Sequence, residues 1–388
     1  MIKPRNKKRL KPIIKSMQKN KLKPILILCL ASIFISGFTY PTSESYETEL
    51  TGGNYNIMID ENNRVLQRTA LPMYIGDEYI AADNKHYRVT RVSGNTAYSK
   101  YIGTEDIAWK EEWDVLAAAS QANKQPLKIA IYHTHSDESY VPTDGTFTIP
   151  GNGGIYRVGS VFTKKLTKLK YEVLHSFKTH DPHDANAYQR SRRTAVDLLK
   201  QKPDALIDVH RDAVPPDVYR SNIKGKEVTK IKLVVGRRNP TMKNNLEFAK
   251  ILKAAMDKTN PGLFEGIFLA RGSYNQELSP RAILVEVGAH TNSRYEAQNG
   301  VDLFGEALPK AIGVTEINYK EPATKSQTNA KDNLPVKLAA NQNKTSWRSA
   351  TWLILFVLVG GFAFLMLSTG SWERTKNALG KEWGKGKK

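Results

Sequence analysis

Short apolar runs that end in polar, chemically active side chains recur along the middle of the chain. The first run covers residues 128–132, and two histidines and two acids follow it in residues 133–140. A second run at 204–209 leads into His210-Arg-Asp212, and a third at 281–287 carries an acid near its end. Each run has the pattern of a buried strand. Since ligands bind at the carboxyl ends of strands in open α/β sheets, we expect these three ends to form one site.

From Pro126 onwards, strand patterns alternate with amphipathic helical patterns. Such alternation is typical of strands joined by crossover helices. The fold class predicted is therefore α/β, with a mixed or parallel sheet flanked by helices. Helices are expected at 158–169, 187–200 and 244–258, and further strands at 171–175 and 230–235.

The preceding part of the chain has a different pattern. Between residues 41 and 125, strand-like pieces such as 55–59 and 86–92 are separated by Gly- and Asn-rich turns, and a helical stretch is expected at 109–122. This pattern predicts a small β-rich accessory region that carries no chemistry. His86 is interpreted as an ordinary strand or surface histidine.

Two long apolar runs lie near the ends of the chain, at 24–40 and 350–370. The second is long enough to span a bilayer, which needs about 20 apolar residues. The first could be a signal peptide, but no small-x-small cleavage pattern follows Phe38, which favours an uncleaved anchor. A membrane span is therefore predicted at each end of the chain.

The charge of +20 is concentrated in the two tails. The first 23 residues contain ten Lys or Arg and no acid, and the last 18 contain six Lys or Arg and two Glu, so the tails carry +14. This distribution argues against a nucleic-acid partner. Basic residues flank both apolar runs, which predicts cytoplasmic termini and an extracytoplasmic body by the positive-inside rule.

The amino-acid composition of the remaining segments completes the predicted domain organisation. Residues 320–349 are rich in Lys, Asn, Gln and Thr and are expected to be a flexible linker. The single cysteine, Cys29, excludes an intramolecular disulfide and a cysteine-based zinc site. The predicted parts are a basic tail (1–23), an anchor (24–40), an accessory region (41–125), a catalytic domain (126–319), the linker (320–349), a span (350–370) and a second basic tail (371–388).

The polar groups at the strand ends suit metal-dependent hydrolysis. Hydrolytic zinc takes about three protein ligands, commonly two His and one carboxylate, and leaves one position open for water. His135, Glu138 and His210 offer these ligands, and Glu286 is a free carboxylate for proton transfer. His133 lies two positions before His135, so the two histidines are expected to share a strand face, with either one pointing into the site.

Glu286 interrupts an otherwise apolar strand, where an unpaired charge costs several kcal/mol. The catalytic interpretation competes with a buried ion pair to Arg281 or Arg211. The histidines of the polar loop at 175–183 could form a second metal site, although solvated loop positions are the simpler interpretation.

Four segments together resemble the stage II sporulation protein P family of peptidoglycan hydrolases. They are residues 131–140 (IYHTHSDESY), 208–212 (DVHRD), 274–281 (YNQELSPR) and 285–290 (VEVGAH). The resemblance covers about residues 66–319 and implies a fold like that of zinc-dependent N-acetylmuramoyl-L-alanine amidases. It also implies that His135 and His210 bind zinc and that Glu286 is the catalytic glutamate. The amidases' glutamate ligand opens a helix where this chain has Ile155-Tyr-Arg-Val158 and no acid, so Glu138 is the nearest candidate.

The activity implied is cleavage of the muramoyl-L-alanine amide bond, and of peptide cross-links, during spore engulfment. The implied partners are peptidoglycan, the membrane, the sporulation lytic transglycosylase D and the sporulation membrane protein M. The carboxy-terminal span departs from the family pattern of a single amino-terminal anchor. Two other classes stay open: a peptidoglycan-binding module without turnover, and a metal-dependent phosphoesterase or polysaccharide deacetylase.

Overall fold

A computed structural model of the protein describes residues 46–50, 53–115 and 126–318. Both predicted membrane spans, both basic tails and the predicted linker lie outside these residues. None of the helices in the described ranges is long and apolar enough to cross a membrane. Only the part of the predicted helix at 109–122 that precedes residue 116 is described, and residues 111–115 are helical.

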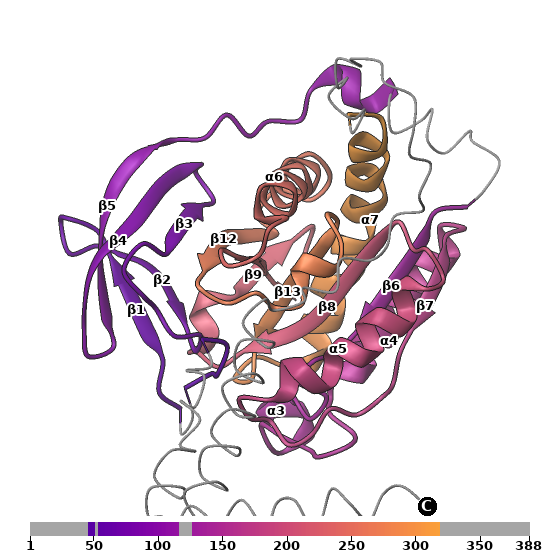
Figure 1. Ribbon diagram of the computed structural model, residues 1–388, viewed down its shortest axis with the longest axis horizontal. Coiled ribbons are helices and arrows are strands. Elements are labelled where there is room, and N and C mark those ends of the chain that lie inside the picture. The colour runs from indigo at the N-terminus through magenta and orange to yellow at the C-terminus, as the bar shows by residue number, and fades with distance from the viewer. Residues whose placement is uncertain (1–45, 51–52, 116–125, 319–388) are drawn as a thin grey trace, which may run out of the picture. The chain divides into compact units, whose positions relative to one another are not determined.

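A single large sheet runs through the described part of the chain (Figure 1). Its strands are β1 (Asn56–Ile59), β2 (Val65–Thr69), β3 (Glu78–Ala81), β4 (Lys85–Ser93), β5 (Thr96–Thr104), β6 (Lys128–Tyr132), β7 (Glu172–His175), β8 (Ala205–Asp212), β11 (Ile231–Gly236), β12 (Phe264–Ala270) and β13 (Ala282–Ala289). Their order across the sheet is β2-β1-β5-β4-β3-β12-β11-β13-β8-β6-β7, and β9 (Arg220–Ile223) and β10 (Lys226–Thr229) form a separate hairpin.

The sheet is mixed, as the α/β prediction allowed. Strands β7, β6, β8 and β13 run parallel to one another, so their carboxyl ends meet at one edge. Strand β11 is antiparallel to β13 but parallel to β12. Strand β3 is antiparallel to β12 and joins the amino-terminal strands to the same sheet. The parallel half contains the three strands that the sequence singled out.

Three helices cover one face of the sheet and form the main core with it. They are α4 (Ile155–Lys168), α6 (Met242–Thr259) and α7 (Arg294–Asn318). The side chains of Ile207 and Val285 belong to this core. Helix α4 has the predicted amphipathic pattern, with Val158, Phe162 and Leu166 buried.

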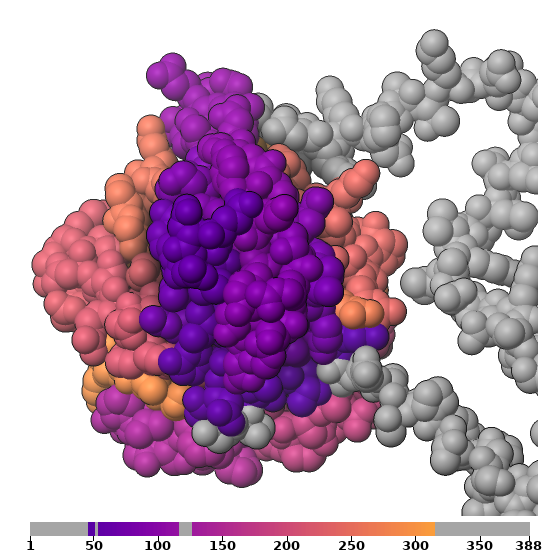
Figure 2. All heavy atoms as spheres, turned by 90° about the vertical axis from the view of Figure 1, so that its left-hand side faces the viewer, coloured from indigo at the N-terminus to yellow at the C-terminus, as the bar shows by residue number. Residues whose placement is uncertain are grey.

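The opposite face is covered by a helix and by the amino-terminal strands. Helix α5 (Ala187–Leu199) packs Ala195 and Leu198 against Leu206 and Ala282. Further along the sheet, Met58 and other amino-terminal residues pack in a cluster with Leu284 of β13. Figure 2 shows the surface on this side, which is built largely from the amino-terminal strands. The accessory region therefore covers part of the face that carries the even-numbered residues of β8 and β13.

Most predicted elements of the α/β part are present with shifted ends. The helix expected at 158–169 begins three residues earlier, at Ile155, and the strand expected at 230–235 is β11. Strand β12 and helix α7 were not predicted. Strand β12 is buried along its whole length, so it has no alternation of polar and apolar residues to identify it.

A lysine is buried in the sheet and is paired with acids. The Nζ of Lys232 in β11 lies 3.2 Å from Asp212 Oδ2 and 3.8 Å from Glu265 Oε2, and it donates a hydrogen bond to the carbonyl of Arg68. The side chain has no exposed surface. This ion pair joins β8, β11 and β12 beneath the amino-terminal strands.

Replacing Lys232 with Met is expected to lower the free energy of unfolding by about 3–5 kcal/mol, because Asp212 would keep a buried charge without its partner. Urea denaturation followed by circular dichroism measures the change. The matched control is Lys85→Met, which removes an exposed pair with Asp83 and should change stability little. Equal stability losses in the two variants would contradict the structural role of the buried pair.

Candidate metal centre and active site

The alternation of side chains along two parallel strands places several polar groups on one face. In β8, Ile207 and Val209 point into the main core, so Asp208 and His210 point to the other face. In β13, Val285 and Val287 point into the core, and Glu286 therefore lies on the same face as His210. The two residues are also in register, since Glu286 pairs with His210 across the strands.

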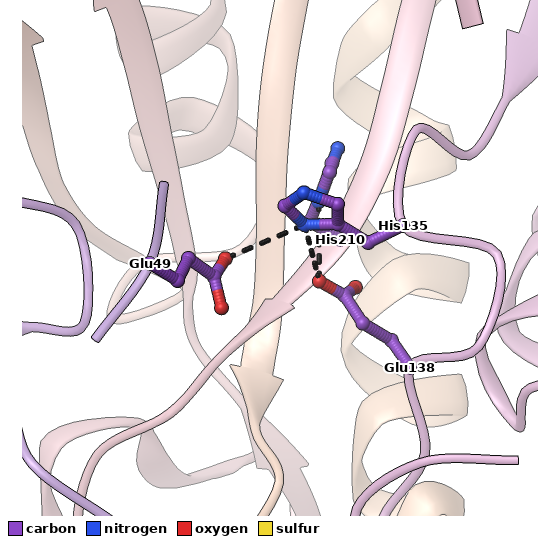
Figure 3. Close-up of side chains that lie close together, drawn as sticks. All are labelled: Glu49, His135, Glu138 and His210. Carbon is purple, nitrogen blue, oxygen red and sulfur yellow. Dashed lines mark hydrogen bonds and ion pairs between the residues drawn. The ribbon is translucent and has the colours of Figure 1, made fainter. Parts of the chain in front are cut away.

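Four side chains converge at this edge of the sheet: Glu49, His135, Glu138 and His210 (Figure 3). One ligand atom from each lies within 4.8 Å of those from the other three, and all four residues are buried. The Nδ1 atom of His135 is 3.1 Å from Glu138 Oε1 and 3.5 Å from Glu49 Oε1. The Nδ1 atom of His210 is 3.3 Å from the same Glu138 oxygen.

Charge interactions shift the pKa values of the residues in this cluster. Burial alone would raise the pKa of Glu138, but the charges of His210 and Arg211 hold it well below its usual value. Burial would lower the pKa of His135, but its contacts with Glu138 and Glu49 raise it to about 9. For His210, the charges of Asp208 and Glu138 outweigh burial and raise the pKa well above its usual value. The carboxylates and imidazoles of the cluster therefore shift one another's pKa values in opposite directions.

Neighbouring groups hold the cluster residues in place. The Nε2 atom of His210 is 3.0 Å from Asp208 Oδ1, close enough for charge attraction but not aligned as a hydrogen bond. Thr134 fixes Asp208 by donating from its backbone N–H (2.8 Å) and its hydroxyl (2.6 Å). The backbone N–H of Arg211 donates to Glu138 Oε2 at 2.8 Å. These contacts orient an imidazole and a carboxylate toward the same point.

Glu286 is buried close to other charged groups but is not paired directly with any of them. It forms no ion pair with any residue in the described ranges, and its Oε2 atom is buried without a hydrogen-bond partner there. Burial and the nearby charge of Asp212 raise the pKa of Glu286 well above its usual value. The alternative interpretation of Glu286 as half of an ion pair with Arg281 or Arg211 is therefore wrong for the described part of the chain.

A pocket of about 360 Å³ lies against the cluster. It places positive, polar and aromatic groups around a space large enough for part of a substrate. Glu49 is the cluster member that lines it. The other lining residues are Leu50, Gly53, Asp137, Phe147, Thr148, His183, Arg211, Ala213 and His290.

His133 does not join the cluster. Its Nδ1 donates a hydrogen bond to the carbonyl of Val209 at 2.8 Å, and its Nε2 lies 2.9 Å from His175 Nε2. It packs against α4, where a Cβ at Gly159 would come within 2.7 Å of the imidazole. The expectation that His133 and His135 share a strand face is wrong, because β6 ends at Tyr132 and the chain leaves the strand before His135.

Arg281 also lies away from the cluster. It precedes the first residue of β13, and its carbonyl accepts a hydrogen bond from Leu206 at the amino end of β8. His210 and Glu286 lie near the carboxyl ends of the same two strands. Arg281 opens the apolar run and Glu286 lies near its end, so the two residues are at opposite ends of β13.

The loop histidines are not solvated as expected. His180 is buried and bonds through Nδ1 to the carbonyl of His133 and through Nε2 to the hydroxyl of Thr194. His183 stacks on His135, with ring centroids 3.7 Å apart, and lines the pocket. His183 is therefore a site residue that the loop composition did not reveal.

Glu49 is the other residue that the sequence analysis missed. It lies before the first strand, in a stretch whose pattern gave no sign of chemistry. An acid among other acids at residues 43–49 carries no periodic or spacing signal. Its role depends entirely on a contact between distant parts of the chain.

The donor set fits a zinc ion on chemical grounds. Two imidazole nitrogens with carboxylate oxygens are the ligand types that hydrolytic zinc sites use. The nitrogens and oxygens belong to buried side chains and lie within 4.8 Å of one another. His135, His210 and Glu138, with Glu49 beside them, would hold the ion.

Comparison with known proteins relates the chain to one family. Residues 47–309 match the profile of a family described as "Stage II sporulation protein P (SpoIIP)". A curated relative, stage II sporulation protein P of Bacillus subtilis (strain 168), is 29% identical over 237 residues, which are 54% of this chain and 59% of the relative. The match thus spans about three-fifths of that relative's length.

Solved structures of N-acetylmuramoyl-L-alanine amidases are more distantly similar. Ami1 of Mycobacterium smegmatis has a TM-score of 0.34 and 15% identity, and the match covers 49% of this chain and 97% of that chain. An amidase of Clostridium difficile 630 has a TM-score of 0.31 and 17% identity, and the match covers 50% of this chain and 98% of that chain.

Proposed function

This chain belongs to the stage II sporulation protein P family, and from that premise we propose that it is a zinc-dependent peptidoglycan hydrolase of sporulation. Its proposed reaction is hydrolysis of the amide bond between muramic acid and L-alanine. A second cut, in the peptide cross-links, belongs to the same proposal. The observation that carries it is the buried cluster of two histidines and two glutamates beside a pocket.

The proposed division of roles follows from position and charge. His135, Glu138 and His210 would hold the zinc ion. When bound, such an ion lowers the pKa of a water molecule and polarises the carbonyl group of the substrate. Glu286 would take the proton from the water and deliver it to the leaving amine. This role is supported by its register with His210 and by its Oε2 atom, which is buried without a hydrogen-bond partner in the described residues.

The side chains that line the pocket favour binding of an anionic substrate that carries a peptide. Arg211 lines it with a guanidinium whose Nη2 donates to the carbonyl of Phe147, while its Nε has no hydrogen-bond partner among the described residues. His290 lines it too, and its Nδ1 is likewise buried without such a partner. Donors without partners at a pocket wall suit the carboxylates and carbonyls of a stem peptide.

The proposal also includes the location of the protein and the proteins beside which it acts. The two apolar runs with basic flanks support an extracytoplasmic body anchored in the membrane, with the amino-terminal strands as its accessory region and residues 126–319 as its catalytic domain. Action beside the lytic transglycosylase D and membrane protein M is proposed from family membership. The body between the two tails keeps +6 of the net charge of +20, and this charge favours attraction to the anionic wall.

Digestion of purified sacculi tests the activity. We expect the full chain with zinc to release stem peptides that carry a new amino terminus on alanine, identified by mass spectrometry. Removing zinc with a chelator should stop the release, and adding zinc should restore it, because the two histidines cannot replace the ion's chemistry.

The product identifies the reaction class. Release of acetate or phosphate would assign the site to a deacetylase or phosphoesterase instead. Binding to sacculi without any product that carries a new amino terminus on alanine, in the presence of zinc and of the transglycosylase, would show a wall-binding module rather than a hydrolase.

A further inference from the structure

The segment at residues 46–50, here called the strap, precedes the first strand of the sheet. It places Glu49 beside His135, Glu138 and His210, the other three members of the cluster. The strap is fixed at several points. The Tyr46 ring faces the guanidinium groups of Arg238 and Arg271, at 4.7 and 4.2 Å from the ring centroid. At its other end, the N–H of Leu50 donates to the carbonyl of Ala70 at 2.9 Å.

Glu47 is the central anchor of the strap. Its Oε1 accepts hydrogen bonds from the backbone N–H groups of Ser273 and Tyr274, at 2.7 and 2.9 Å. Tyr274 and Asn275 have positive φ angles of 53° and 56°. Glu47 therefore stabilises a turn whose backbone is costly for residues other than glycine, and it holds Glu49 two positions further on.

Glu49 stands between the rest of the cluster and the pocket. Its Oε1 is 3.5 Å from His135 Nδ1, on the cluster side. Its Oε2 is 3.6 Å from His183 Nε2 and 3.5 Å from Arg211 Nη1, and both of these residues line the pocket. Of the four cluster residues, Glu49 alone lines the pocket, while His135, Glu138 and His210 lie behind it.

The number of protein ligands that a zinc ion would have here indicates the role of Glu49. A catalytic zinc site uses three protein ligands and keeps the fourth position for water or substrate, whereas a site with four protein ligands is closed. His135, Glu138 and His210 already supply three. We propose that Glu49 is a detachable fourth ligand, and that the strap must leave the cluster before substrate reaches the metal. This inference rests on the proposed function and concerns the regulation of that site.

The contacts that hold the strap are of kinds that allow it to leave the cluster and return. Apart from the ion pairs of Glu49 itself, they are hydrogen bonds and ring contacts of modest strength rather than a large apolar surface. Thr48 in the middle of the strap is exposed, and Tyr46, Glu47 and Leu50 are only partly buried. A partner or substrate that competes for Glu47 or Tyr46 would therefore release Glu49.

Zinc affinity is the first test, measured on the full chain by competition with a coloured chelator. Glu49→Ala is expected to raise the Kd for zinc at least about tenfold, since loss of a group that only supports ligands already costs 10–100-fold. Glu47→Ala should raise it by a smaller factor, because the ligand remains but its anchor is lost. Glu61→Gln removes an exposed acid in the turn after β1 and should leave the Kd unchanged.

Protease accessibility is the second test and is independent of turnover. Chymotrypsin cleaves after residues such as Tyr46 and Leu50, and mass spectrometry identifies the new amino termini. We expect zinc to slow cleavage within the strap of the unaltered chain and of Glu61→Gln. In Glu49→Ala, zinc should give no protection. Equal cleavage with and without zinc in the unaltered chain would overturn the proposal.

The rate of sacculus digestion at saturating zinc is the third measurement. Glu49→Ala and Glu47→Ala should both digest faster than the unaltered chain. An unchanged zinc Kd in Glu49→Ala, or a loss of digestion with zinc still bound, would overturn the inference. If no variant digests sacculi while the Kd and the zinc protection change as expected, the hydrolase proposal fails and the closing role of Glu49 stands.

Discussion

Replacing Glu286 with Gln is expected to lower the rate of peptidoglycan hydrolysis by about 10² to 10⁴, the usual contribution of a positioned proton-transfer group. The amide keeps the size of the side chain but cannot accept the proton of the attacking water. Its effect on the activation free energy is about 3–5 kcal/mol. Product release from sacculi at saturating zinc measures it.

The same variant should be as stable as the unaltered chain. Burial and the charge of Asp212 raise the pKa of Glu286, and Gln fills nearly the same space without placing a charge in the buried strand. The unfolding free energy should change by less than about 1 kcal/mol, because no cation loses its partner. The control is Glu172→Gln, a partly exposed strand glutamate of β7. A Glu286→Gln chain that is destabilised yet still cleaves at the native rate would end the catalytic assignment.

Replacing His210 with Ala is expected to remove zinc and with it all turnover. The variant loses one imidazole ligand, and Glu138 and Asp208 lose the charge that holds them in the cluster. We expect the Kd for zinc to rise by more than about 10²-fold, beyond the effect of removing a supporting group. Metal analysis of the purified protein and chelator competition measure this change.

A second strand histidine provides the control for His210. His86 in β4 is also buried and lies between two carboxylates, at 2.9 Å from Glu78 and 2.7 Å from Glu105. It is far from the cluster in the sheet order, so His86→Ala should keep its zinc. Native zinc content in His210→Ala would remove His210 from the ligand set, and loss of zinc in both variants would indicate a general effect of folding.

Local patterns were enough to predict the parallel half of the sheet. Strands β6, β8 and β13 were expected from their apolar runs, and α4, α5 and α6 from their helical periodicity. These signals are local because a buried strand and an amphipathic helix each show their environment in a few adjacent residues. The α/β class and the meeting of strand ends at one edge followed from them.

The antiparallel part of the sheet could not be predicted in the same way. The pairing of β3 with β12 joins residues 78–81 to 266–269, and no short-range pattern encodes a contact over such a separation. The accessory strands had visible alternation and turn residues, but their place in the sheet depends on which edge is left free by the other strands. Their position over the face that carries His210 and Glu286 is therefore a property of the assembled fold.

The sequence by itself determined that His135, Glu138, His210 and Glu286 sit on or just after strands with polar ends, because side-chain alternation is a local property of the backbone. Only the tertiary structure decided that His133 turns toward α4 while His135 enters the cluster, since the chain leaves β6 at Tyr132. The tertiary structure likewise brought Glu49 into the cluster. That contact depends on hydrogen bonds between Glu47 and a loop more than 200 residues further along the chain, and no pattern among neighbouring residues encodes it.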